Sequence, residues 1–451
     1  MDQGSRPKRL AVSFAQRRRS GRAPPAPPPL LGARSHAGPA DFAESWGSLR
    51  ALRRAKSPLA LAQRRIPMAA PDLLKAARSL RETIEAEADR VEETLNMTAP
   101  IVEGLVDSGL FRLLMPEALG GFESDPSTII EVCEEISFAD GSVGWSYAQN
   151  TSCMAYLAYM DPELVEPFAR SRAGAGMFAP LSVVIREEGG YRVSGKHQFA
   201  TGSPHADFIG GAGMELVDGE SVMGPNGLPS ILAYIVPMEK AVMKGNWDVM
   251  GLCGTASFDY EIPEQFVEAG LTHSIFETHP RSGGALYGLG PVPLGTISSC
   301  GWAIGVAKRA LHEIVDIVTT QARTRMGSDP LKEQQVFQRD LALHTQALNS
   351  VRLLAHETYG SAVDAIARGE SPETLEQIRR ESKAAASYIV QVSREATTFA
   401  FQASGSHGLR NPNRLQRCFR DMYVGASHIV FDERNFVESV KERLGIVPLP
   451  F

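Results

Sequence analysis

Apolar side chains recur at helical spacing through the first part of the chain. The pattern predicts helices over residues 71–96, 98–109, 126–139 and 142–160, the last of them strongly apolar. Gly109 ends the second segment, where a glycine commonly caps a helix. We therefore expect this portion to be helical.

The pattern changes near residue 174. Short runs, often alternating between apolar and polar residues, are separated by Gly, Pro, Asp or Asn, as is typical of strands. Gly189 and Gly190 stand between two such runs and indicate a hairpin. The expected strands cover residues 177–187, 190–200, 206–217, 230–237 and 257–267.

Helical spacing returns after Pro293. It predicts long helices over about 297–324, 331–368, 372–403 and 414–443, with short connections, which is the arrangement of a four-helix bundle. The predicted fold class is α+β. It consists of an N-terminal helical domain at 68–172, a β-barrel-like middle domain at 173–292 and a C-terminal bundle at 293–451.

Charge sets the first 67 residues apart. Residues 1–67 contain 14 Lys and Arg against 3 Asp and Glu, whereas the whole chain has 46 against 52. This basic, proline-rich segment has little apolar periodicity, so we expect it to be disordered. Three interpretations remain open: an extension without function ahead of a start at Met68, an organelle transit peptide, or a segment that contacts nucleic acid or anionic membrane.

Composition and motifs exclude several classes of function. No window approaches ~18 consecutive apolar residues, so we expect no membrane-spanning helix. The five cysteines are scattered and form neither a disulfide framework nor a zinc spacing, which favours a reducing compartment. There is no dinucleotide-binding glycine motif, phosphate-binding loop or metal-spaced cluster, and the acidic body argues against a nucleic-acid substrate.

Four stretches together resemble the acyl-CoA dehydrogenase family in order and spacing. They are residues 116–121, 194–202, 247–257 and 415–421, the last followed by His428. The resemblance covers roughly residues 71–447. It implies the acyl-CoA dehydrogenase fold, a bound FAD or FMN and, by family expectation, a homotetramer.

The branch of the family follows from one position. Ile429 stands where the dehydrogenases usually carry the Glu that removes a proton from the substrate, and Ile cannot act as a base. A histidine next to this position, here His428, resembles the pattern of the two-component flavin-dependent monooxygenases. The resemblance therefore implies an enzyme that takes reduced flavin from a separate reductase. With O₂ it would form a C4a-hydroperoxyflavin and oxygenate a small aromatic or heterocyclic substrate.

The same resemblance assigns roles to individual residues. Thr201 would lie near flavin N5, and His428 would deprotonate a phenol or assist proton transfer to the peroxide. His205 is a substrate or supporting contact. Cys153 stands where phenol hydroxylases of the branch often carry a further His, with Asn150 a turn earlier, so that substrate class is open.

Further residues would hold the cofactor. The resemblance places Phe178 on the flavin face and Gly202 beside it. Arg323, with Arg325 as an alternative, would reach the phosphates of a neighbouring subunit's flavin. Gln402 and Gly405 resemble the turn that closes over a neighbour's flavin, although Ser406 replaces a glycine there.

Two alternatives to an oxygenase remain. One is an acyl-CoA dehydrogenase or related flavin oxidase whose base comes from elsewhere, with Glu433 nearest in sequence. The other is a flavin- or partner-binding relative without turnover. We expect a cytoplasmic protein, with organelle import through the basic extension as the alternative.

Overall fold

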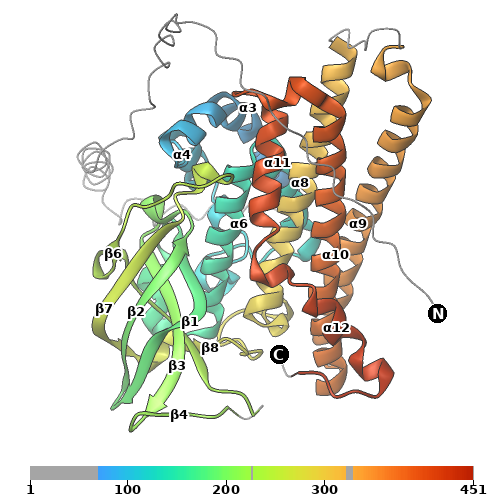
Figure 1. The fold of residues 1–451 in the computed structure, drawn as a ribbon. Helices are drawn as coiled ribbons and strands as arrows, with labels where there is room; N and C mark the ends of the chain where they lie inside the picture. The colour runs from blue at the N-terminus through green and yellow to red at the C-terminus, as the bar shows by residue number, and fades with distance from the viewer. Residues whose placement is uncertain (1–69, 225–226, 321–328, 450–451) are drawn as a thin grey trace, which may run out of the picture. The chain divides into compact units, whose positions relative to one another are not determined.

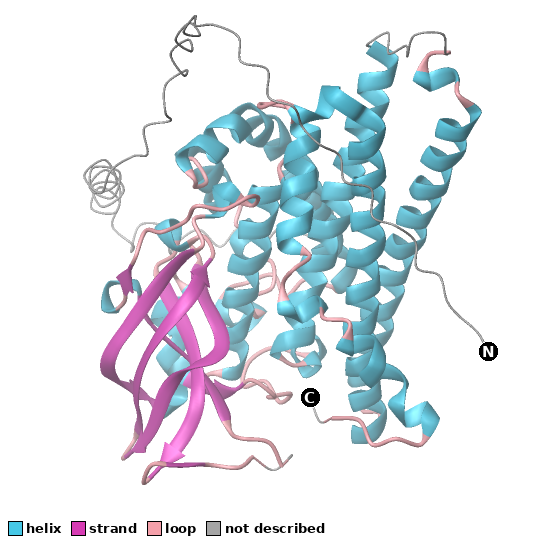
Figure 2. Cartoon of the chain, viewed as in Figure 1, coloured by secondary structure: helices cyan, strands magenta, loops and turns pink. Residues whose placement is uncertain are grey.

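The computed structural model describes residues 70–224, 227–320 and 329–449. Along these residues helices come first, then a sheet, then helices again (Figures 1 and 2). This order confirms the predicted α+β fold class. The disorder expected for residues 1–67, and the roles considered for them, lie outside the described residues.

Helix α6 lies centrally among the N-terminal helices. It begins after Asp140, whose carboxylate accepts hydrogen bonds from the N–H groups of Ser142 and Val143, both at 3.0 Å. Nearly all its side chains are buried, because the helix lies between the sheet and α8 (Figure 1). The other N-terminal helices are α3 (Ala70–Thr94), α4 (Ala99–Asp107), α5 (Pro126–Ala139) and α7 (Pro162–Ala169), with α6 at Gly141–Ala155.

The predicted strands all form, and they belong to one sheet. The strand order is β6-β7-β2-β1-β3-β5-β8, with β4 paired to β3. Every pairing is antiparallel except β1 with β3, and Gly189 at φ +78° turns the β1–β2 hairpin. The strands are β1 (Gly174–Glu187), β2 (Gly190–Ala200), β3 (Phe208–Val217), β4 (Glu220–Ser221), β5 (Ile231–Pro237), β6 (Val242–Met243), β7 (Phe258–Glu268) and β8 (Thr272–Ser274).

Long helices make up the C-terminal part. Helix α8 packs against α5, α6 and α10, and its Trp302 indole donates to the Gly141 carbonyl at 3.0 Å. This bond joins the start of α6 to the bundle. The helices are α8 (Pro291–Thr320), α9 (Gln335–Ala367), α10 (Pro372–Ser404), α11 (Arg414–Gly425) and α12 (Arg434–Lys441).

Two predicted helices are too long. The 142–160 helix ends at Ala155 and continues as a 3₁₀ turn. The 414–443 helix breaks after Gly425, where a Cβ would lie 2.1 Å from the Trp302 ring, and a 3₁₀ turn at Ile429–Phe431 separates α11 from α12. Helix α11 therefore ends beside Trp302, and His428 stands in the connection between α11 and α12.

Candidate functional site

Asn150 of α6 is hydrogen-bonded to two other predicted site residues, Thr201 and His205. Its amide nitrogen donates to the carbonyls of Gly174, at 2.7 Å, and Thr201, at 3.1 Å. Its amide oxygen lies 2.9 Å from Nε2 of His205 and accepts that N–H, because the nitrogen already faces two carbonyls. Asn150 therefore joins α6 to the start of β1 and the end of β2.

Thr201 lies at the junction of β2 and the loop that precedes β7. Its hydroxyl oxygen is 2.8 Å from that of Ser257, which is 2.7 Å from that of Thr255. The backbone is tied as well, since Gly202 N–H donates to the Thr255 carbonyl at 2.9 Å. Gly202 has φ +69° and a Cβ there would lie 2.4 Å from the Asn150 oxygen, so this turn requires glycine.

Aromatic surface is exposed next to this polar cluster. Phe199, two residues before Thr201, has a left-handed backbone conformation with φ +63°. Its side chain is 48% exposed, and its ring lies 6.2 Å from the ring of Trp247. Phe178 of β1 is half-buried against Tyr156 at 4.9 Å. A flat apolar ring near a hydroxyl suits a planar heteroaromatic group such as a flavin, so Phe199 and Thr201 fit the predicted cofactor.

His428 is held between aromatic rings in the turn after α11. Its ring lies 5.8 Å from Trp145 of α6 and 6.2 Å from Phe431. Its Nδ1 accepts the Val430 N–H at 3.2 Å, so in the neutral ring the proton is on Nε2. Burial lowers the pKa of His428 to about 4, so at neutral pH it is a neutral Nε2–H donor.

Helix α6 contacts both His428 and Thr201, through different residues. Trp145 contacts His428, and Asn150, which is hydrogen-bonded to Thr201, lies five residues later, about 7.5 Å along the axis and about 140° around it. Cys153 is buried three residues beyond Asn150, and burial raises its thiol pKa to about 12. Cys153 is thus a protonated, unreactive thiol at neutral pH.

Asp421 supports the loop of the candidate site, and the sequence did not single it out for this. It is buried in α11 and accepts the Leu252 N–H at 2.5 Å, which fixes the loop that carries Thr255 and Ser257. Burial first, and then the negative charge of Asp140, raise its pKa to about 7. In the sequence, the Arg420-Asp421 pair of the 415–421 stretch is part of the family resemblance, but it does not indicate that the Asp421 carboxylate holds the loop.

We expect Asp421→Asn to remove a pH-dependent loss of stability. Because the folded pKa of Asp421 lies above its unfolded value, its contribution favours folding at low pH and is lost as pH rises through 7. Asn keeps the acceptor for Leu252 but cannot ionise. Relative to wild type, the variant should gain about 2 kcal/mol of unfolding free energy between about pH 5.5 and about pH 8. Urea unfolding at both pH values measures this, and parallel profiles would contradict it.

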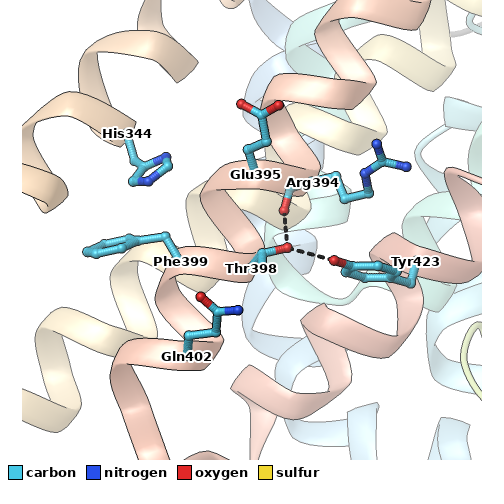
Figure 3. A pocket seen from close by; sticks show the side chains of 7 residues that line it. All are labelled: His344, Arg394, Glu395, Thr398, Phe399, Gln402 and Tyr423. Carbon is cyan, nitrogen blue, oxygen red and sulfur yellow. Dashed lines mark hydrogen bonds between the residues drawn. The ribbon is translucent and has the colours of Figure 1, made fainter. Parts of the chain in front are cut away.

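The remaining predicted cofactor residues do not join this cluster within one chain. Gln402 lines a groove of about 380 Å³ on α9, α10 and α11, and Gly405 follows α10 (Figure 3). There the Thr398 hydroxyl donates to the Arg394 carbonyl at 2.7 Å and lies 3.0 Å from the Tyr423 hydroxyl. Helix α9 lies on the side of the bundle away from the sheet (Figure 1). Arg323 and Arg325 are outside the described residues.

The described part of the chain offers neither a metal-binding cluster nor a membrane-spanning helix. Within residues 70–224, 227–320 and 329–449, no group of three or more His, Cys, Asp or Glu side chains is placed to hold a metal ion. In the same ranges, no helix is both long enough and apolar enough to cross a membrane.

Family models match both helical parts of the chain. The acyl-CoA dehydrogenase N-terminal domain matches residues 73–165 and the C-terminal domain matches residues 297–433, together half of the chain. The protein belongs to the acyl-CoA dehydrogenase family. This confirms the resemblance stated from the sequence.

Several proteins that resemble this chain are oxygenases. Indole-3-acetate monooxygenase of Pseudomonas putida is 26% identical, over 79% of this chain and 89% of its own. The oxygenase component of an FADH(2)-dependent resorcinol hydroxylase of Rhizobium sp. is 27% identical, over 77% and 88%. The crystal structure of the HsaA monooxygenase from M. tuberculosis has a TM-score of 0.76 at 22% identity, over 84% and 99%, and supports the fold.

Proposed function

We propose that the protein is the oxygenase component of a two-component flavin-dependent monooxygenase. It binds reduced FMN or FAD supplied by a separate reductase. One atom of O₂ enters a small aromatic or heteroaromatic substrate and the other leaves as water, with both electrons coming from the reduced flavin. The curated relatives, which match along more than three quarters of the chain, support this class.

One observation favours oxygenation over dehydrogenation. The position of the dehydrogenase base holds Ile429, whose side chain is 71% exposed, while the neighbouring His428 contacts α6. Glu433, the alternative base, is exposed at the start of α12. A hydrogen-bond donor therefore takes the place of a carboxylate base.

The chain's own residues have distinct tasks in this reaction. The Nε2–H of His428 donates to an oxygen of the substrate or of the departing water. Thr201 would offer its hydroxyl to the N5 edge of the flavin, and Asn150 holds the Thr201 backbone in place. The buried side chains of α6 exclude water, which protects the reactive flavin from a wasteful side reaction. When bound, the flavin supplies the electrons and the oxygen activation.

The test mixes the protein anaerobically with reduced FMN or FAD and then adds ¹⁸O₂. We expect slower flavin reoxidation than in free solution, and one ¹⁸O atom in the product from a probe panel of indole, indole-3-acetate and resorcinol. Reoxidation at the free-solution rate with stoichiometric H₂O₂ and no labelled product would overturn the proposal. Bleaching of bound FAD by an acyl-CoA would instead favour the dehydrogenase.

We also propose a homotetramer in the cytoplasm. Gln402 and Gly405 lie apart from the Asn150–Thr201 cluster, so they could complete a flavin site only on a neighbouring copy. The five cysteines are free thiols, which suits a reducing compartment. Light scattering after size exclusion should give about four times the 48.8 kDa chain mass. A monomer that still binds flavin would contradict the shared site.

A further inference from the structure

A buried row of hydroxyl groups leads away from Thr201. It runs from Thr201 through Ser257 and Thr255 to the Leu252 carbonyl, with successive oxygen–oxygen distances of 2.8, 2.7 and 2.9 Å. All four residues are buried. The row is therefore largely shielded from bulk water, and its protein partners decide which way the hydroxyl protons point.

The carbonyl at the end fixes the direction of every proton. A carbonyl oxygen only accepts, so the Thr255 hydroxyl must donate its single proton to Leu252. Thr255 can then only accept from Ser257, and Ser257 can only accept from Thr201. The reverse direction would leave the oxygens of Thr255 and Leu252 facing each other without a proton, which is unfavourable in a buried site. The Trp247 indole and the Thr255 N–H also donate to the Leu252 carbonyl, at 3.1 and 3.2 Å, and hold it in place.

The hydroxyl of Thr201 therefore presents only lone pairs to a ligand. Reduced flavin carries a hydrogen on N5 and donates there, whereas oxidised flavin has a bare N5 that accepts. We propose that Ser257 and Thr255 are positioning residues, which hold Thr201 as an acceptor and so make the site prefer reduced over oxidised flavin. This inference rests on the proposed function, in which Thr201 faces N5.

A preference for reduced flavin is useful to an oxygenase that receives its flavin from a separate reductase. Reduced flavin must be captured from solution in the presence of the oxidised form, and the rest of the ring offers similar surface in both states. A fixed acceptor at N5 gives a hydrogen bond to one state and an oxygen–nitrogen repulsion to the other. The row thereby discriminates between the two states of the same molecule.

The experiment measures dissociation constants of the full chain for FMN and FAD, each oxidised and dithionite-reduced, under argon. Wild type should bind the reduced form more tightly. In Ser257→Ala the Thr201 proton is free to turn toward N5, so the oxidised-to-reduced ratio of dissociation constants should fall about 10-fold. The midpoint potential of the bound two-electron couple should then fall by about 30 mV, which is that ratio converted.

Matched variants separate positioning from general damage. Thr255→Val should lower the ratio like Ser257→Ala, while Thr255→Ser keeps a hydroxyl and should restore it. Ser203→Ala is the control, because this neighbouring buried hydroxyl donates to the Ala256 carbonyl at 3.3 Å, outside the row. Denaturant midpoints check that each variant folds.

The outcomes distinguish the two proposals. If wild type binds neither form of either flavin, the proposed function fails. If wild type prefers reduced flavin but Ser257→Ala and Thr255→Val keep the same ratio, the positioning role is wrong and the function stands. Equal binding of both forms by wild type likewise overturns the positioning role.

Discussion

Replacing His428 by alanine should lower kcat/KM roughly 100-fold or more, because the change removes a positioned hydrogen-bond donor. The neutral ring offers Nε2–H, since Nδ1 already accepts from Val430. His428→Gln places an amide N–H near the same point and should recover part of the loss. Turnover of a probe substrate with a fixed excess of reduced flavin measures both variants.

A distant histidine provides the control for this experiment. His279 has a side chain that is 93% exposed, so His279→Ala should keep wild-type activity. If His428→Ala also kept it, the assignment of His428 to the reaction would be wrong. Equal losses in His428→Ala and His428→Gln would instead show that the ring's packing against Trp145 matters more than its N–H.

The pH profile tests the protonation state of His428. Its pKa is lowered to about 4 by burial, so the neutral ring prevails at every pH well above that value. His428 should therefore contribute no step to kcat/KM between about pH 6 and about pH 8. A fall in activity below about pH 6.5 that disappears in His428→Gln would mean that the ring titrates with its ordinary pKa and acts as a base.

Much of the fold could be predicted because its elements have strong local signals. The alternating runs of the sheet and the apolar spacing of α8, α9 and α10 carry the period of the structure that forms. The break after α11 could not be predicted this way. Residues 429–437 keep an amphipathic pattern, and the sequence does not reveal that Gly425, at the end of α11, packs against Trp302, far away along the chain.

The site was predictable only in part, for a related reason. Residue type and family position indicated Asn150, Thr201 and His205, and the structure joins them through hydrogen bonds. The 247–257 stretch was recognised as a motif, but the proton direction in its hydroxyls depends on distances across the loop. The roles of all these residues, and of Arg323 and Gln402, stay predictions.

A network of charges holds the loop and α11 against the N-terminal helices. The Arg417 guanidinium, 7% exposed, lies 2.6 Å from both Asp89 and Glu92 of α3 and 3.5 Å from Asp140. Asp140 also caps α6, and burial raises its pKa. One arginine thus compensates several carboxylates at the point where α3, α6 and α11 meet.

Arg417→Ala should lower the free energy of unfolding by about 3–5 kcal/mol, the cost of leaving a buried charge without its partner. Urea unfolding at neutral pH measures it. Arg339→Ala is the control, because Arg339 is 65% exposed and pairs with Asp340 at 2.7 Å, so it should change the free energy of unfolding by under about 1 kcal/mol.

The double variant Arg417→Ala/Asp140→Asn decides whether the loss comes from charge. Asn also caps helices well, so the double variant keeps the start of α6 while removing the buried carboxylate. It should be more stable than Arg417→Ala alone, because the uncompensated charge nearest the interior is gone. If the two variants were equally unstable, Arg417 would stabilise the junction through the packing of its aliphatic stem, and the ion pair with Asp140 would contribute little.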